Sequence, residues 1–171
     1  HCSYKDGIFE AVKTLKDYGH RDIAFLSGLR IGDNNERYRY LVEALKFYDL
    51  PINKKIMIDG NRYEETNEGA GASALLELLS RKEPFTAVFA INDLMAFGAM
   101  SVLHKEGYKI PDDISVIGCD NLEIGRYFLP SLSTLDVSAF KIGKYLMKEL
   151  ISKIENKNSV RKELVSSYIG R

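Results

Sequence analysis

The sequence of 171 residues contains no tryptophan, only two cysteines and four prolines, and no long apolar run. Every apolar run falls well short of the about 20 residues that cross a bilayer, which argues against a membrane protein. The cysteines, at positions 2 and 119, lack metal-site spacing, so we expect reduced thiols. The first residues show no charged segment followed by an apolar core. We therefore predict no signal peptide and a cytoplasmic location.

The chain also lacks a net charge, because 24 Lys and Arg residues balance 24 Asp and Glu residues. A broad nucleic-acid surface needs a local excess of cations, so this balance argues against one but leaves a small basic patch open. Hydrophobic residues make up 45% of the chain, which is typical of a globular protein. The length predicts one domain, or two very small ones.

Apolar periodicity alternates between the repeats of helices and of buried strands. Helices are expected before Gly19, and over residues 36–48, 69–79, 92–106 and 138–155. Strands are expected over residues 22–27, 55–58, 86–90, 114–118, 132–137 and 160–169. Such alternation, with continuously apolar strands, predicts an α/β fold with a parallel sheet covered by helices on both faces.

Ligands of such sheets bind where the carboxyl ends of the strands open into a crevice. The polar side chains expected at this edge are those of Arg37, Arg39, Asn92, Asp93, Asp120 and Asn121. Guanidinium donors, carboxylate acceptors and amides, which do both, suit the neighbouring hydroxyls of a neutral polyol. Phosphate would be repelled by the carboxylates.

Each of these residues also has a structural interpretation. Asn92 and Asp93 stand at a helix start, where both types commonly act as N-caps. Asp120 and Asn121 could shape an Asx turn, and Arg39 could be a solvated charge. The Gly and Ala residues at 69–72 lack the spacing of a phosphate-binding loop, and we interpret them as tight helix packing.

Catalytic patterns are weak. His1, His20 and His104 have no recognisable nucleophile or metal partner, and His20 precedes a strand, at the opposite edge of the sheet. Asp93 and Asp120 could approach each other as a hydrolytic carboxylate pair, although nothing predicts the environment that an acid catalyst requires. We expect a binding protein rather than an enzyme, without metal or cofactor.

Residues 86–121, TAVFAINDLMAFGAMSVLHKEGYKIPDDISVIGCDN, resemble the lactose/galactose-repressor family of bacterial transcription regulators. The shared pattern runs from an apolar strand through Asn-Asp and a Met/Ala/Gly-rich helix to Ile-Pro, Asp-Ile, Val-Gly and Asp-Asn. Residues 19–21 (GHR), 37–45 and 130–134 (PSLST) extend the likeness over essentially the whole chain.

The resemblance implies a two-lobed, periplasmic-binding-protein-like effector domain that senses a sugar or nucleoside in a homodimer. Operator DNA would be bound through an N-terminal helix-turn-helix, which this sequence does not contain. Residues 1–131 and 160–171 would form the second lobe, and residues 132–159 the returning strand and helix of the first. The alternative is a solute-binding protein for sugar uptake or chemoreception without DNA function.

The resemblance also implies residue roles. Arg39, Asn92 and Asp120 match effector contacts, Asp93 a supporting position, and Tyr63 an aromatic ring that stacks on the ligand. The positions at which two subunits pack are matched by Met95, Phe97 and Phe128. Cys119 departs from the family, which usually has an aromatic residue there. We further expect the apolar face of the 138–155 helix, whose partner lobe is absent, to fold back or to pair with another copy.

Overall fold

A six-stranded sheet forms the centre of the computed structural model, which describes residues 2–32, 34–60, 65–155 and 164–171. The strand order is β3-β2-β4-β5-β6-β8, and all neighbours are parallel except β6 and β8. The strands are β2 (Ile23–Leu26), β3 (Met57–Ile58), β4 (Ala87–Ala90), β5 (Ser115–Cys119), β6 (Ser133–Asp136) and β8 (Ser167–Ile169). The predicted α/β class is confirmed, with one antiparallel edge strand added.

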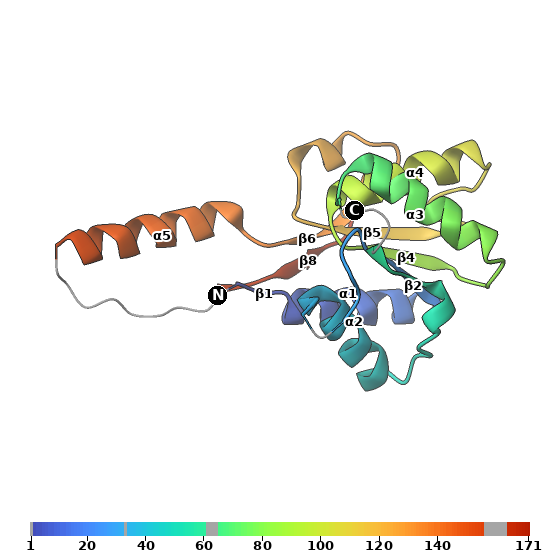
Figure 1. Cartoon of the computed structure of the whole chain (residues 1–171), viewed down its shortest axis with the longest axis horizontal. Helices are drawn as coiled ribbons and strands as arrows, with labels where there is room; N and C mark the ends of the chain where they lie inside the picture. The colour runs from blue at the N-terminus through green and yellow to red at the C-terminus, as the bar shows by residue number, and fades with distance from the viewer. Residues whose placement is uncertain (1, 33, 61–64, 156–163) are drawn as a thin grey trace.

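Helices cover both faces of this sheet (Figure 1). One face carries α1 (Lys5–Asp17) and α2 (Glu36–Phe47), and the other carries α3 (Glu68–Ser80) and α4 (Asp93–Lys105). Two short 3-10 helices, η1 (Lys54–Ile56) and η3 (Glu123–Arg126), lie in connections. Burial from both sides explains why β2 and β4 are apolar throughout rather than alternating.

Asparagine side chains cap the N-termini of three of these helices. Asn35, Asn67 and Asn92 each accept a hydrogen bond from the backbone N–H three residues later. This is the usual N-cap geometry, which satisfies an amide that the helix leaves unpaired. At the start of α4 the N-cap is therefore Asn92, and the capping interpretation of Asp93 is wrong.

Glycines allow α3 and α4 to pack backbone against backbone. A Cβ atom on Gly98 would lie 1.9 Å from the carbonyl oxygen of Glu68, and one on Gly71 would lie 2.2 Å from that of Met95. Both distances are far below van der Waals contact, so only glycine fits. The interpretation of residues 69–72 as tight helix packing is confirmed.

We call the six-stranded sheet together with helices α1 to α4 the body. A second, smaller part of the chain lies beside it. It consists of a two-stranded parallel sheet, β1 (Cys2–Ser3) with β7 (Leu164–Val165), and of α5 (Ala139–Ile154), which projects away from the body (Figure 1). We call β1, β7 and α5 the outlying unit. None of the α5 residues is buried. The expectation that this helix folds back is thus wrong for the described residues, whereas pairing with another copy stays a prediction.

The structure divides the chain differently from the expected lobe boundaries. The segment expected to return to the first lobe begins with β6, yet β6 lies inside the main sheet between β5 and β8. In the described part of that segment, α5 is the element that lies in the outlying unit. The expected last strand is two strands in the described residues, with β7 in the outlying sheet and β8 in the main one. Buried Ser166 stands between them.

Candidate functional site

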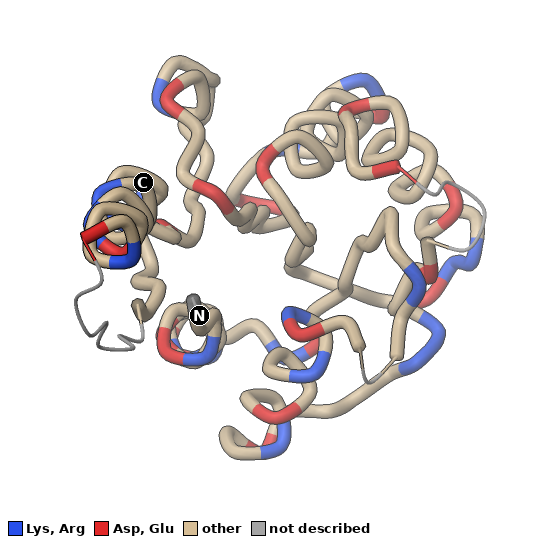
Figure 2. The backbone as a smooth tube through the Cα atoms, turned by 60° about the vertical axis from the view of Figure 1, so that its left-hand side comes forward, with Lys and Arg blue, Asp and Glu red and all other residues tan. Residues whose placement is uncertain are grey.

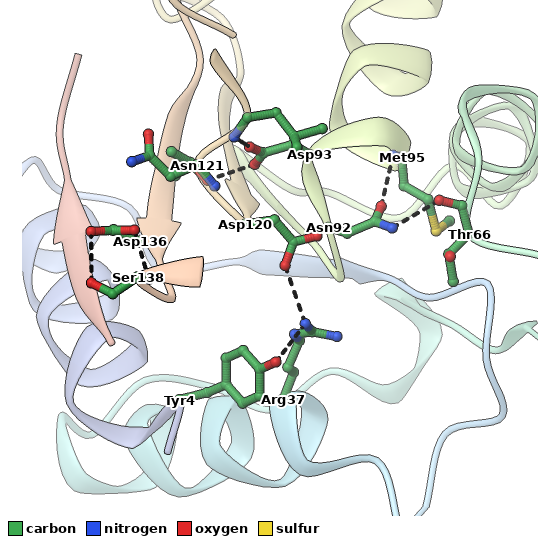
Figure 3. Close-up of polar contacts among 12 residues, drawn as sticks. Tyr4, Arg37, Thr66, Asn92, Asp93, Met95, Asp120, Asn121, Asp136 and Ser138 are labelled. Carbon is green, nitrogen blue, oxygen red and sulfur yellow. Dashed lines mark hydrogen bonds and ion pairs between the residues drawn. The ribbon is translucent and has the colours of Figure 1, made fainter. Parts of the chain in front are cut away.

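Polar side chains meet at the carboxyl ends of the central strands, where the topology predicts a crevice (Figure 3). Arg37 comes from the first turn of α2, which follows β2, and Asp120 directly follows β5. Nη2 of Arg37 lies 3.4 Å from Oδ1 of Asp120, and their side chains are 21% and 34% exposed. The pair is thus partly shielded from water but still open to a ligand.

Arg37 is also held by Tyr4, at the start of α1. Nη2 of Arg37 donates a hydrogen bond of 2.9 Å to the Tyr4 hydroxyl, and Cζ lies 4.2 Å from the centre of the Tyr4 ring. The buried Nε of Arg37 has no hydrogen-bond partner among the described residues. A buried donor without a partner is costly and marks a functional-site candidate.

The backbone around Asp120 is conformationally unusual. Asp120 has φ +125° and Asn121 has φ +54°, values that side-chain-bearing residues rarely adopt. Neighbouring bonds fix this turn: the N–H of Asp120 donates to the carbonyl oxygen of Leu135 at 3.0 Å, and that of Asn121 to Oγ1 of Thr134 at 3.3 Å. Strained backbone of this kind persists where surrounding structure holds it, often at ligand sites.

Asp93 stabilises the turn at Asp120 and Asn121 through hydrogen bonds with neighbouring residues. It is fully buried, and its carboxylate accepts hydrogen bonds from the Thr134 hydroxyl at 2.5 Å and from the Leu122 N–H at 2.7 Å. A Cβ atom on Gly118 would lie 2.2 Å from Oδ1 of Asp93, so glycine makes room for the carboxylate. Burial raises the pKa of Asp93, and its two hydrogen bonds oppose that rise. These contacts fit a supporting rather than a ligand-contacting position.

Both polar atoms of the Asn92 amide are engaged within the chain. Oδ1 accepts from the N–H of Met95 at 2.9 Å, and Nδ2 donates to the carbonyl oxygen of Thr66 at 2.8 Å (Figure 3). Asn92 thereby joins the start of α4 to the segment that leads into α3. Its side chain stands at the predicted edge, and contact with a ligand stays a prediction.

Arg39 lies away from Asp120. Its side chain is 52% exposed, its Nη2 is 3.7 Å from Oε1 of Glu36, and its Cζ is 4.9 Å from the centre of the Tyr40 ring. Two residues along an α-helix correspond to a rotation of about 200°, so Arg37 and Arg39 point to opposite sides of α2. The structure therefore brings Arg37, not Arg39, to Asp120. The predicted stacking residue Tyr63 lies outside the described residues.

The electrostatics of the site depend on partial burial. Burial raises the pKa of Asp120, and the Arg37 cation opposes that rise. Cys119 is fully buried next to this pair, and burial raises the pKa of its thiol to about 12. The thiol is therefore neutral and adds no charge. The Arg37–Asp120 pair offers a guanidinium and a carboxylate, which can bind adjacent hydroxyl groups.

The residues predicted at a subunit interface pack largely inside the chain. Met95 has no exposed surface, Phe97 is 6% exposed, and the rings of Phe97 and Phe128 stack with centres 4.3 Å apart. Next to them Tyr127 is 76% exposed and Leu129 is 98% exposed. The interface role of Met95, Phe97 and Phe128 stays a prediction.

Other features of the described residues were compared with this edge of the sheet. In residues 2–32, 34–60, 65–155 and 164–171, no three His, Cys, Asp or Glu side chains group as metal ligands. A cavity of about 680 Å³ opens at the amino ends of β5 and β6, lined in part by His20, Ser115 and Ser133. The ring nitrogens of His20 form hydrogen bonds there with the hydroxyl groups of Thr86 and Ser115. Lys and Arg residues are mixed with Asp and Glu along the helices (Figure 2).

None of the helices in the described part of the chain combines the length and apolar character that a membrane crossing requires.

Comparison with known proteins gives a consistent set of similarities. The family described as periplasmic binding protein-like domain matches residues 12–169. The HTH-type transcriptional repressor PurR of Vibrio parahaemolyticus is 39% identical over 154 residues, covering 90% of this chain and 45% of that protein. The chain thus spans about half the length of the curated relatives it matches.

Solved structures give the same result. A sugar-binding transcriptional regulator of the LacI family from Escherichia coli, complexed with phosphate, has a TM-score of 0.87 and 31% identity, covering 99% of this chain and 60% of that one. A LacI family regulator from Enterococcus faecium with bound ribose has a TM-score of 0.83 and 29% identity, covering 99% and 63%. The predicted likeness to this group of regulators is confirmed.

Proposed function

Because this chain belongs to the family of periplasmic binding protein-like domains, we propose that it is the effector-sensing part of a LacI-type transcriptional regulator. In this proposal a sugar or nucleoside binds between the body and the remainder of a longer, two-lobed protein. The similar proteins support this function, since they include a transcriptional repressor and a regulator with bound ribose. They also support sensing rather than catalysis.

The observation that carries the proposal is the Arg37–Asp120 pair at the carboxyl edge of the sheet. The cation and the carboxylate stand 3.4 Å apart and both keep some exposure. A diol that reaches them can donate to the carboxylate and accept from the guanidinium, which neither ion alone allows. We assign Arg37 and Asp120 as effector ligands and Asp93 as their support, with Asn92 and Tyr63 as further candidates.

Ligand binding would regulate DNA binding by selecting one orientation of the two lobes. A ligand shifts such an equilibrium only if it binds one orientation more tightly than the other. A ligand held between Arg37 and the second lobe meets this condition, because it contacts both lobes only when they are close. The resulting rotation would change the separation of two helix-turn-helix heads on operator DNA. Such a regulator acts in the cytoplasm.

A homodimer would supply the two heads. We propose that the exposed apolar residues beside Phe128, namely Ile124, Tyr127 and Leu129, contact a second copy, with Phe97 and Phe128 supporting them from within. These three side chains are 57%, 76% and 98% exposed. Exposed apolar groups that lie together are typical of association surfaces.

The second candidate, a solute-binding protein without DNA function, shares the fold and the ligand site. It differs in the segment that precedes the sensing domain. A helix-turn-helix in that segment supports the regulator, whereas a signal peptide or lipobox supports transport. The HTH-type repressor among the similar proteins favours the regulator.

Calorimetry on the two-lobed protein tests the site, with a panel of hexoses, pentoses, disaccharides and nucleosides. Arg37→Ala and Asp120→Ala should each weaken binding roughly ten- to a hundredfold, because each removes a hydrogen bond to a charged group. Arg39→Ala is the matched control, with the same substitution two residues away, and should change affinity little. Unchanged binding in the Arg37 and Asp120 variants, or a loss confined to Arg39→Ala, would refute the assignment.

A further inference from the structure

Tyr4 occupies a distinctive place in the chain. It directly follows β1, which pairs with β7 in the outlying unit, and it directly precedes α1, which packs on the body. Its neighbour Ser3 accepts a hydrogen bond of 2.9 Å from the N–H of Ser166. Tyr4 therefore stands in a segment that joins the outlying unit to the body.

Tyr4 contacts the ligand-site arginine in two ways. Its hydroxyl oxygen accepts a hydrogen bond from Nη2 of Arg37 at 2.9 Å, and its ring lies 4.2 Å from Cζ of the same guanidinium. The same Nη2 lies 3.4 Å from Asp120, so one nitrogen faces both the joining segment and the ligand site (Figure 3). An aromatic ring beneath a cation restricts where the cation can lie.

The joining segment is itself firmly packed. A Cβ atom on Gly7 would lie 2.7 Å from Oγ of Ser166, so the first turn of α1 touches the segment that follows β7. With the bond from Ser166 to Ser3, this contact links the two connecting segments. The carbonyl oxygen of Tyr4 also accepts a hydrogen bond of 3.1 Å from the N–H of Ile8 in α1, so Tyr4 is tied to both parts.

We propose that Tyr4 is a positioning residue, which orients the Arg37 guanidinium toward Asp120 and ties that orientation to the segment joining the outlying unit to the body. This inference rests on the proposed function, since it assigns Arg37 to the effector site. Tyr4 acts through Arg37 and is not itself a ligand contact. A change in the relative orientation of the two parts then alters the effector site directly.

Two readouts test the proposal. The first is the Nε–Hε NMR signal of Arg37 in the isotope-labelled chain without ligand, assigned by its loss in Arg37→Lys. The second is the dissociation constant of the two-lobed protein for D-ribose, cellobiose and adenosine, each used as a probe. Tyr4→Leu removes the ring and the hydroxyl, whereas Tyr4→Phe keeps the ring. Tyr40→Leu is the matched control, because Tyr40 lies against Arg39 on the same helix as Arg37.

Tyr4→Leu should shift the Arg37 signal and weaken any probe that binds by about tenfold or more, and Tyr4→Phe should retain part of both. Tyr40→Leu should change neither. An Arg37 signal unmoved by Tyr4→Leu, or moved equally by Tyr40→Leu, would overturn the inference. A shifted signal with no probe bound by the unchanged two-lobed protein supports the positioning role and counts against the proposed ligand class.

Discussion

The body and the outlying unit differ sharply in how they bury apolar surface. In the body, β2 and β4 are fully buried and α4 buries nine of its residues. In the outlying unit, α5 is as regular a helix but buries none, and Phe140 and Ile154 are 84% and 72% exposed. The body therefore carries its own hydrophobic core, whereas α5 presents an apolar face that nothing in the described residues covers.

This difference indicates where the folding free energy of the chain resides. Burial of apolar area is the main favourable contribution to folding, and in the described residues every buried hydrophobic side chain lies in the body. The outlying unit should add little to stability and should instead respond to whatever partner covers it. Such a division suits a sensor, because a weakly held part can be repositioned without unfolding the rest.

The largest expected effect compares two phenylalanines. Phe89 in β4 is fully buried, and Phe140 in α5 is 84% exposed. Phe89→Ala should lower the free energy of unfolding by about 3–5 kcal/mol, because it leaves a cavity in the core. Phe140→Ala should change it by less than about 0.5 kcal/mol. Urea denaturation measures both, and equal losses would show that the comparison is wrong.

A smaller effect concerns association through α5. Leu146, Leu150 and Ile151 are each about half exposed, and together they form part of an uncovered apolar face. At high micromolar concentration the chain should sediment above its 19.4 kDa monomer mass. Replacing these three residues by serine should shift the distribution toward monomer. A single monomeric species for the unchanged chain would contradict the prediction.

The smallest effect concerns His20 in the body. Burial lowers the pKa of His20, whose ring nitrogens bond the hydroxyls of Thr86 and Ser115. The unfolded chain then binds a proton more readily than the folded one, so stability should fall as pH drops below about 6.5, the ordinary histidine value. His20→Gln should lose part of this dependence. Parallel stability curves for both proteins between pH 7 and pH 5 would exclude the effect.

Much of the body could be predicted from the sequence, because buried parallel strands and amphipathic helices leave strong patterns. The expected strands at 22–27, 86–90 and 114–118 correspond to β2, β4 and β5 within a residue or two. The antiparallel edge was not predictable, since the apolar pattern of 160–169 contains no sign of strand direction. Nor does it show that Ser166 separates two strands belonging to different sheets.

The sequence predicted at which edge of the sheet the candidate site lies, but not all of the residues that form it. Strand topology correctly brings Asp120 to the same edge as α2, yet sequence alone does not show which of Arg37 and Arg39 faces it. That depends on the rotation of α2 about its axis, which is set by the packing of its buried face, Leu41, Ala44 and Leu45, on the core. Tyr4 had no detectable signal, because its contact with Arg37 joins residues 33 positions apart.

Chemical-shift mapping on the labelled two-lobed protein tests the central claim most directly, with the sugar or nucleoside that calorimetry selects. The account predicts that the perturbed signals gather at the carboxyl edge of the sheet, in Arg37, Asp120 and Asn121. Signals gathered instead around His20 and Ser115, at the cavity on the amino edge, would contradict it.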